Sequence, residues 1–150
     1  MNAFDLLKED HKKVSGLFDQ LTETTERASK TRDDLFAKLK SELDVHTQVE
    51  EEIFYPVLKQ EDETRDITLE AFEEHRVVKR LLKELDVAEK GTEQWTAKLT
   101  VLKENVEHHV EEEEGDMFKK ARKVLSDEQA EDLGNRMAAA KQRFASAKTA

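Results

Sequence analysis

The chain has 150 residues, a length that suits one domain with a single hydrophobic core. Its formal net charge of −10 disfavours contact with nucleic-acid phosphates and anionic lipids, so we expect neither a nucleic-acid nor a membrane partner. The sequence has no cysteine, which excludes disulfides, thiolate metal sites and cysteine nucleophiles.

The composition favours helices over strands. Glycine and proline are scarce, at 4 and 1 residues, and charged residues make up 40% of the chain. We therefore expect an all-α fold. No apolar run approaches the roughly 20 residues of a membrane span, and the amino terminus lacks a basic region followed by an apolar signal core. On these grounds we expect a cytoplasmic protein.

Apolar residues at helical spacing predict two helices in the first part of the chain. The first spans about residues 2–27, and His11 fills the one gap in its apolar stripe. The second spans about residues 32–59, where His46 and Glu50 both lie on the apolar stripe. A charged turn is expected to follow the second helix.

Two further helices are predicted next. One spans about residues 66–90 and again carries a single histidine, His75, on its stripe. The other spans about residues 92–124 and carries His109 and Glu113. Polar residues therefore interrupt the apolar stripe in all four helices.

A fifth helix is predicted to begin after Ser126, which forms a capping box with Gln129, and to end near residue 145. We expect residues 1–125 to form a four-helix bundle. Residues 126–150 are expected to contribute an amphipathic helix that packs on the bundle or on a partner, which leaves monomer and homodimer open.

One motif occurs twice, in residues 46–56 and in residues 109–118. Each copy places a histidine four residues before a glutamate, and such side chains lie on the same face of a helix within reach of one metal or of two adjacent metals. His108 lies about 100° away from the stripe of its helix, so His109 is the preferred ligand. Pro56 is expected to kink or tighten the end of the first copy.

An up-down-up-down bundle would bring these groups to one depth, because the starts of the first and third helices lie at the same end as the ends of the second and fourth. At about 1.5 Å per residue, that common depth is roughly 15 Å. Buried glutamates need cations. We predict a metal site at which imidazole and carboxylate suit iron, manganese or zinc. The candidate ligands are His11, His46, Glu50, His75, His109 and Glu113.

Other residues have simpler interpretations. Glu114 is an alternative to Glu113 if the fourth helix is slightly rotated. The remaining glutamates of the two runs are expected to be solvated: Glu51, Glu52, Glu111 and Glu112. The aromatic residues are expected to pack in the core: Phe4, Phe36, Trp95 and Phe118.

The motifs together resemble the hemerythrin-like, HHE cation-binding family over about residues 3–124. The resemblance is carried by Asp10-His11, His46-x3-Glu50-Glu51 followed by Phe54-Tyr55-Pro56, Glu74-His75, and His109-x3-Glu113-Glu114 followed by Phe118.

The resemblance implies a non-heme di-iron centre with an oxo or hydroxo bridge. Glu50 and Glu113 would bridge the two irons, and the four histidines would be terminal ligands. Two departures from the oxygen-carrying members matter. Lys79 stands where those members have a further histidine, and Glu114 stands where they typically have an aspartate. If Lys79 points inward, it would donate a hydrogen bond to a bound oxygen species. Snorkelling to solvent is the simpler alternative.

With four histidines, one iron would keep an additional open position, which argues against simple oxygen storage. The first hypothesis is a di-iron protein that handles dioxygen, hydrogen peroxide or nitric oxide, with catalase-like peroxide decomposition as its enzymatic form. The alternative is an iron, oxygen or nitric oxide sensor, or an iron-homeostasis module, without turnover. A third hypothesis is a helical interaction protein whose histidines are incidental. The role of Tyr55 stays open at this point.

Overall fold

The computed structural model describes residues 1–149, and all its regular elements are helical. Residue 150, the last of the predicted C-terminal segment, lies outside the described residues. The all-α fold with an additional C-terminal helix is thereby confirmed. In chain order the elements are α1 (Ala3–Thr22), α2 (Ser29–Val49), η1 (Glu50–Phe54), α3 (Tyr55–Lys59), α4 (Asp62–Val87), α5 (Glu93–Glu112), η2 (Glu113–Met117), α6 (Phe118–Val124) and α7 (Asp127–Thr149).

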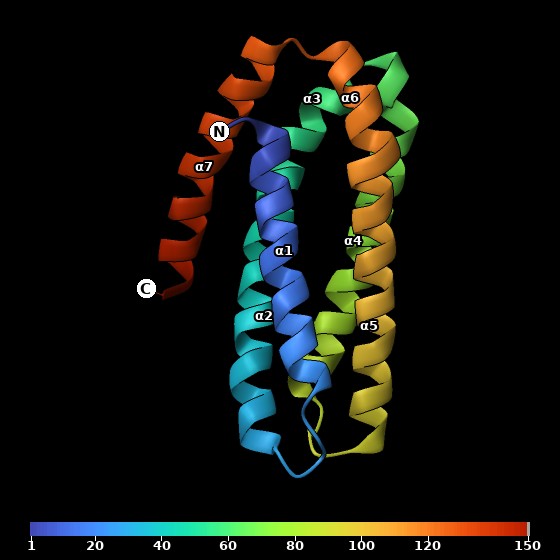
Figure 1. Cartoon of the computed structure of the whole chain (residues 1–150), viewed down its shortest axis with the longest axis vertical. Helices are drawn as coiled ribbons and strands as arrows, with labels where there is room; N and C mark the ends of the chain where they lie inside the picture. The colour runs from blue at the N-terminus through green and yellow to red at the C-terminus, as the bar shows by residue number, and fades with distance from the viewer. Residues whose placement is uncertain (150) are drawn as a thin grey trace.

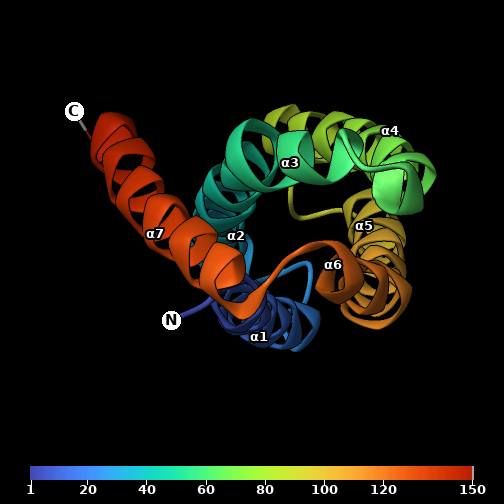
Figure 2. The same ribbon diagram turned by 90° about the horizontal axis from the view of Figure 1, so that it is seen from above.

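Four long helical segments form the bundle (Figure 1). They are α1, α2 with its continuation through η1 and α3, α4, and α5 with its continuation through η2 and α6. Helix α7 turns back after α6 and packs against α1, α2 and η1. Seen from above, it lies outside the bundle on the side opposite α4 and α5 (Figure 2).

The helix boundaries partly follow the predicted ones. Thr92 caps α5 by accepting a hydrogen bond from the Trp95 backbone N–H at 3.1 Å. Ser126 and Gln129 form the predicted capping box before α7, with reciprocal bonds of 2.8 and 3.1 Å. The charged turn was placed too far along the chain, because α4 already begins at Asp62. Asp62 and the following glutamate favour this earlier start, since acidic groups stabilise the first turn of a helix.

The apolar interior consists of two clusters separated by a polar layer. One cluster, around Phe4, Phe54 and Phe118, fills the end at which the chain begins. The other, around Phe36 and Trp95, fills the opposite end. Between the two clusters lie the buried side chains of His11, His46, Glu50, His75, His109 and Glu113, which form the polar layer. The apolar clusters on either side shield this layer from water.

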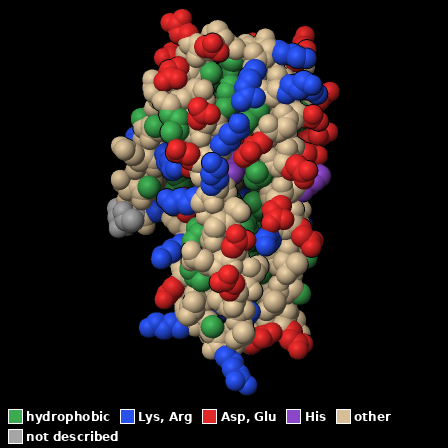
Figure 3. Space-filling model, viewed as in Figure 1, with side chains coloured by type: hydrophobic (Ala, Val, Ile, Leu, Met, Phe, Trp, Pro, Cys, Tyr) green, Lys and Arg blue, Asp and Glu red, His purple; other side chains and the backbone are tan. Residues whose placement is uncertain are grey.

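The outer surface matches the charged composition. Acidic and basic side chains are interspersed over the face in Figure 3, where apolar atoms are visible only in small patches. None of the described helices is both long and apolar enough to cross a membrane.

Candidate metal centre

Two π-helical turns set the shape of the site. Each turn begins at the glutamate of the repeated motif, η1 at Glu50 and η2 at Glu113. The backbone N–H groups of Tyr55 and Phe118 donate to the carbonyls of these glutamates, five residues back. Wider turns of this kind are rare and often mark functional sites.

Pro56 follows the first of these turns, at the start of α3. Proline lacks an N–H and its ring clashes with the carbonyl four residues earlier in an α-helix. The wider turn before Pro56 accommodates the ring, but proline is not the general cause, because η2 has the same form with no proline after it. The expected tightening is wrong, because the turn before Pro56 widens. The extra residue in the turn also brings Tyr55 round to the face that Glu50 occupies.

All six predicted ligand residues are buried and lie together in the polar layer. Glu50 Oε1 lies 3.1 Å from Nε2 of His46 and 3.1 Å from Nε2 of His75. Glu113 likewise lies 3.1 Å from Nε2 of His11 and 3.3 Å from Nε2 of His109. Each carboxylate thus contacts one histidine from each half of the chain.

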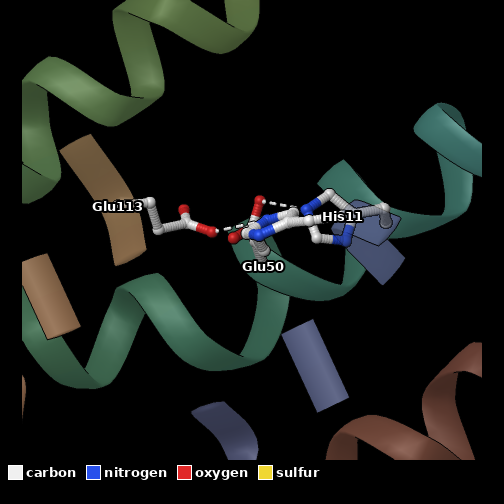
Figure 4. A group of neighbouring side chains, drawn as sticks. His11, Glu50 and Glu113 are labelled. Atoms are coloured by element: carbon white, nitrogen blue, oxygen red, sulfur yellow. Dashed lines mark ion pairs between the residues drawn. The ribbon is translucent and has the colours of Figure 1, made fainter. Parts of the chain in front are cut away.

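These side chains form two groups of donors that can hold a cation. The first comprises His11, His46, Glu50 and Glu113, with one donor atom of each within 4.8 Å of the others. The second comprises Glu50, His75 and His109. Glu50 belongs to both groups, and Figure 4 shows it between His11 and Glu113. The two groups of donors therefore overlap at Glu50.

The unpaired polar atoms of the site fit a metal. Among the described residues, four buried side-chain atoms lack a hydrogen-bond partner: His11 Nε2, both carboxylate oxygens of Glu50, and Glu113 Oε1. Leaving buried polar groups unsatisfied costs about 1–3 kcal/mol each, and more for charged groups. All four atoms point into the polar layer as potential ligands. The donor set therefore matches a cation site better than a hydrogen-bonded core.

Each candidate histidine is held on its far side by a carboxylate. Nδ1 bonds to Glu114 at 2.6 Å in His11, to Asp10 at 2.9 Å in His46, to Glu51 at 2.8 Å in His75, and to Glu74 at 2.6 Å in His109. When Nδ1 carries the proton and donates it to a carboxylate, Nε2 is left with its lone pair toward the centre. Such partners orient metal-binding histidines and raise their basicity.

These outer carboxylates correct two expectations. Glu51 is not simply a solvated residue, since it holds His75. Glu114 is not placed to substitute for Glu113, because it bonds to the Nδ1 of His11. Lys79 does not point into the site either: its Nζ lies 2.7 Å from a Glu51 oxygen, and its side chain is about half exposed. Glu52 and Glu111 are exposed, as expected.

The carboxylates raise the pKa values of the histidines in the metal-free site. Burial by itself would lower the pKa of His109, but hydrogen bonds to Glu113 and Glu74 outweigh it and raise the pKa to about 10. The pKa of His46 is raised well above its ordinary value despite burial, through the charge of Glu50 and the hydrogen bond to Asp10. Burial opposes ionisation of Glu113, yet hydrogen bonds from His109 and His11 hold its pKa well below the usual range. The metal-free layer is therefore a network of imidazolium and carboxylate groups.

Tyr55 is the site residue whose role the sequence left open. Its side chain is fully buried, and its hydroxyl donates a hydrogen bond to Glu113 Oε2. The same hydroxyl lies 3.3 Å from Nε2 of His75 and 3.2 Å from Nε2 of His109. It thus shares the space between the two histidines of the second donor group. The sequence signal was the tyrosine before Pro56, five residues after Glu50.

His108 lies apart from this layer. Its side chain is 66% exposed and pairs with Glu112 at 3.2 Å. Glu74, His108 and Glu112 form a further group of possible donors at the surface, with His108 exposed. Exposed groups of this kind are common without a metal, so it adds nothing to the site.

Comparison with known proteins places the chain in a family. The model of the hemerythrin HHE cation-binding domain matches residues 2–121. The crystal structure of an HHE domain-containing protein from Mycobacterium kansasii, a homolog of Rv2633c, superimposes with a TM-score of 0.87. That protein is 30% identical, and the match covers 98% of this chain and 89% of the other.

Two further relatives differ in length. The uncharacterized protein Rv2633c of Mycobacterium tuberculosis is 34% identical over 93% of this chain and 84% of its own. A Nostoc protein named DNA nickase is 29% identical over 96% of this chain, but the chain spans only 40% of that relative's length. The match over residues 2–121, together with the buried histidine and glutamate donors, shows that this chain belongs to the hemerythrin HHE cation-binding family.

Proposed function

We propose that the chain is a non-heme di-iron protein that binds or reacts with small oxidants such as dioxygen, hydrogen peroxide or nitric oxide. The observation that carries the proposal is the pair of donor groups that share Glu50 in one buried layer. Two carboxylates offset part of the charge of two divalent ions, and a set of six protein ligands leaves coordination positions open on two ions. Imidazole and carboxylate donors suit iron.

The residues divide between two ions. His11 and His46, with Glu50 and Glu113, would hold the first, and His75 and His109, with Glu50, would hold the second. When bound, two irons supply the electrons for reduction, or the open positions for binding, of a small oxidant. The outer carboxylates keep each Nε2 directed at the centre. Tyr55 is a buried hydroxyl donor beside both His75 and His109.

A small cavity beside the centre limits what can bind. It has a volume of about 20 Å³, enough for one water-sized molecule. The four histidines line it together with apolar residues that include Val14, Leu43 and Val106. An apolar wall favours an uncharged diatomic or peroxide ligand over an ion or a metabolite.

A surface groove between α1 and α5 adjoins this cavity. The groove has a volume of about 170 Å³ and shares His11, Val14, Val106 and Val110 with the cavity lining. The shared residues form the wall between the groove and the cavity, and three of the four are valines. Small uncharged molecules pass such a barrier more readily than charged ones, because no desolvation cost of an ion arises.

Peroxide consumption by the iron-loaded protein tests the enzymatic form. We expect consumption faster than that of an equal concentration of free iron, with Glu50→Ala inactive and His108→Ala unchanged. His108→Ala is the matched control because it removes an exposed histidine adjacent in sequence to His109. Consumption no faster than that of free iron would reject turnover.

The alternative is a sensor or store for iron, oxygen or nitric oxide without turnover. The same cavity is compatible with this form, because one water-sized ligand fits it. An absorption band that appears reversibly with oxygen or nitric oxide, without net consumption, would support this form.

A further inference from the structure

Helix α7 lies outside the residues that the family model matches, yet one of its side chains contacts a residue that borders the polar layer. The match ends at residue 121, and α7 begins at Asp127. Nevertheless Lys141 of α7 donates a hydrogen bond to Oδ1 of Asp10, which is 3% exposed. The other oxygen of Asp10, Oδ2, lies 2.9 Å from Nδ1 of His46. One buried carboxylate thus joins the C-terminal helix to a candidate metal ligand.

We propose that α7 is a functional part of the metal centre, in which Lys141 is a positioning residue that holds Asp10 against His46. The inference rests on the proposed metal function. Lys141 fixes one carboxylate oxygen, so that the other faces Nδ1 of His46. Because His46 then donates from Nδ1, its Nε2 is directed at Glu50, 3.1 Å away.

The same arrangement occurs on the other side of Glu50. Lys79 holds Glu51, and Glu51 bonds to Nδ1 of His75. His46 and His75 are the two histidines in contact with Glu50 Oε1. A lysine therefore anchors the outer carboxylate on both sides of the shared glutamate.

The source of the lysine differs between the two sides. Lys79 comes from the bundle, four residues after His75 on α4, whereas Lys141 comes from α7. Among the described residues, no lysine or arginine pairs with Glu74 or Glu114, the partners of the other two histidines. Loss of α7 would therefore affect the His46 side selectively.

Close packing at Gly134 fixes where α7 lies against α1, and with it the position of Lys141. A Cβ atom added to Gly134 would lie 2.2 Å from the Met1 carbonyl oxygen and 2.7 Å from the Asn2 carbonyl carbon. Only glycine therefore lets α7 approach the start of α1 this closely. Helix α7 also packs directly against η1, the turn that begins with Glu50. Its placement thus bears on His46 and on Glu50 together.

Chelator competition on the anaerobic, Fe²⁺-loaded full chain tests the proposal. We expect Lys141→Met to lower the affinity for one of the two ions about tenfold. This is the low end of the effect of removing an outer partner of a metal ligand, because Lys141 acts on His46 through Asp10. Lys141→Arg should restore the wild-type affinity. Lys148→Met is the matched control, because Lys148 is on the same helix, is also 34% exposed, and pairs with Asp44 away from the ligands.

A spectral measurement separates positioning from general stability. The visible absorption of the oxidised, iron-loaded protein should change in Lys141→Met, return in Lys141→Arg and stay unchanged in Lys148→Met. Gly134→Ala is the second variant, since it displaces α7 without altering any side chain of the site. It should show the same loss of affinity for one ion, and it keeps the test valid if Lys141→Met does not fold.

The outcomes distinguish this inference from the proposed function. Wild-type affinities and spectrum in Lys141→Met would overturn the positioning role while leaving a di-iron centre intact. An equal loss in Lys148→Met would also overturn it, because the effect would then be general to the helix. A wild-type protein that binds fewer than two ions would instead refute the proposed function.

Discussion

Raising the pH from 6.5 to 10 should destabilise the metal-free protein. The pKa of His109 is about 10 in the folded chain, against an ordinary value of 6.5. A group with a raised folded-state pKa stabilises the fold fully below its unfolded value, and this stability is lost as the pH rises through the folded value. The difference corresponds to roughly 5 kcal/mol at most for His109 alone.

The other histidines act in the same direction. The pKa values of His11, His46 and His75 are also raised, through their carboxylate neighbours and against the effect of burial. Glu113, whose pKa is lowered, acts elsewhere: its contribution is lost only as the pH falls below its ordinary value of 4.5. The decline between pH 6.5 and pH 10 therefore reports on the histidines.

Urea unfolding in the presence of a chelator, at a series of pH values, measures this effect. The free energy of unfolding should fall by several kcal/mol across the range, and by clearly less in His109→Asn. His108→Asn should decline as the wild type does, because His108 is largely exposed. A free energy that is constant or rises with pH would refute the reasoning. The metal-bound protein should behave oppositely and release metal on acidification, since protons compete for the same ligands.

Three further predictions concern single side chains. Glu50→Ala or Glu113→Ala should lose at least one metal ion in metal analysis, and retention of both would contradict the ligand assignment. Tyr55→Phe should weaken binding of one ion about tenfold in chelator competition, because Glu113 loses a buried donor; unchanged affinities would exclude this role. Arg32, a buried residue of α2 at the end of the bundle opposite the N-terminus, donates to the hydroxyls of Thr24 and Thr96 and to the Lys90 carbonyl. Arg32→Met should cost roughly 2–4 kcal/mol of unfolding free energy, since it leaves these partly buried oxygen acceptors unpaired. Metal content should not change, and its loss would show that the two ends of the bundle are coupled.

The sequence predicted the layer of six residues because helical periodicity places each on an apolar stripe, and antiparallel packing then sets their depth. The same reasoning could not foresee the π-turns at Glu50 and Glu113. Periodicity assumes a constant number of residues per turn, so a residue such as Tyr55 falls off the face when the turn widens.

The carboxylates that bond to Nδ1 of the histidines could not be predicted from helical periodicity either. Glu51 lies next to a buried residue in sequence and looks like part of a solvated run. Its role depends on a histidine from another helix, His75, and therefore on how the helices are rotated about their axes. Lys141 depends on the docking of a fifth helix, for which the sequence left both the bundle and a partner open.

Anomalous diffraction from crystals of the iron-loaded protein, at the iron absorption edge, tests the central claim most directly. We predict two peaks per chain on either side of Glu50, one beside His11 and His46 and the other beside His75 and His109. A single peak, or peaks remote from Glu50, would contradict the account.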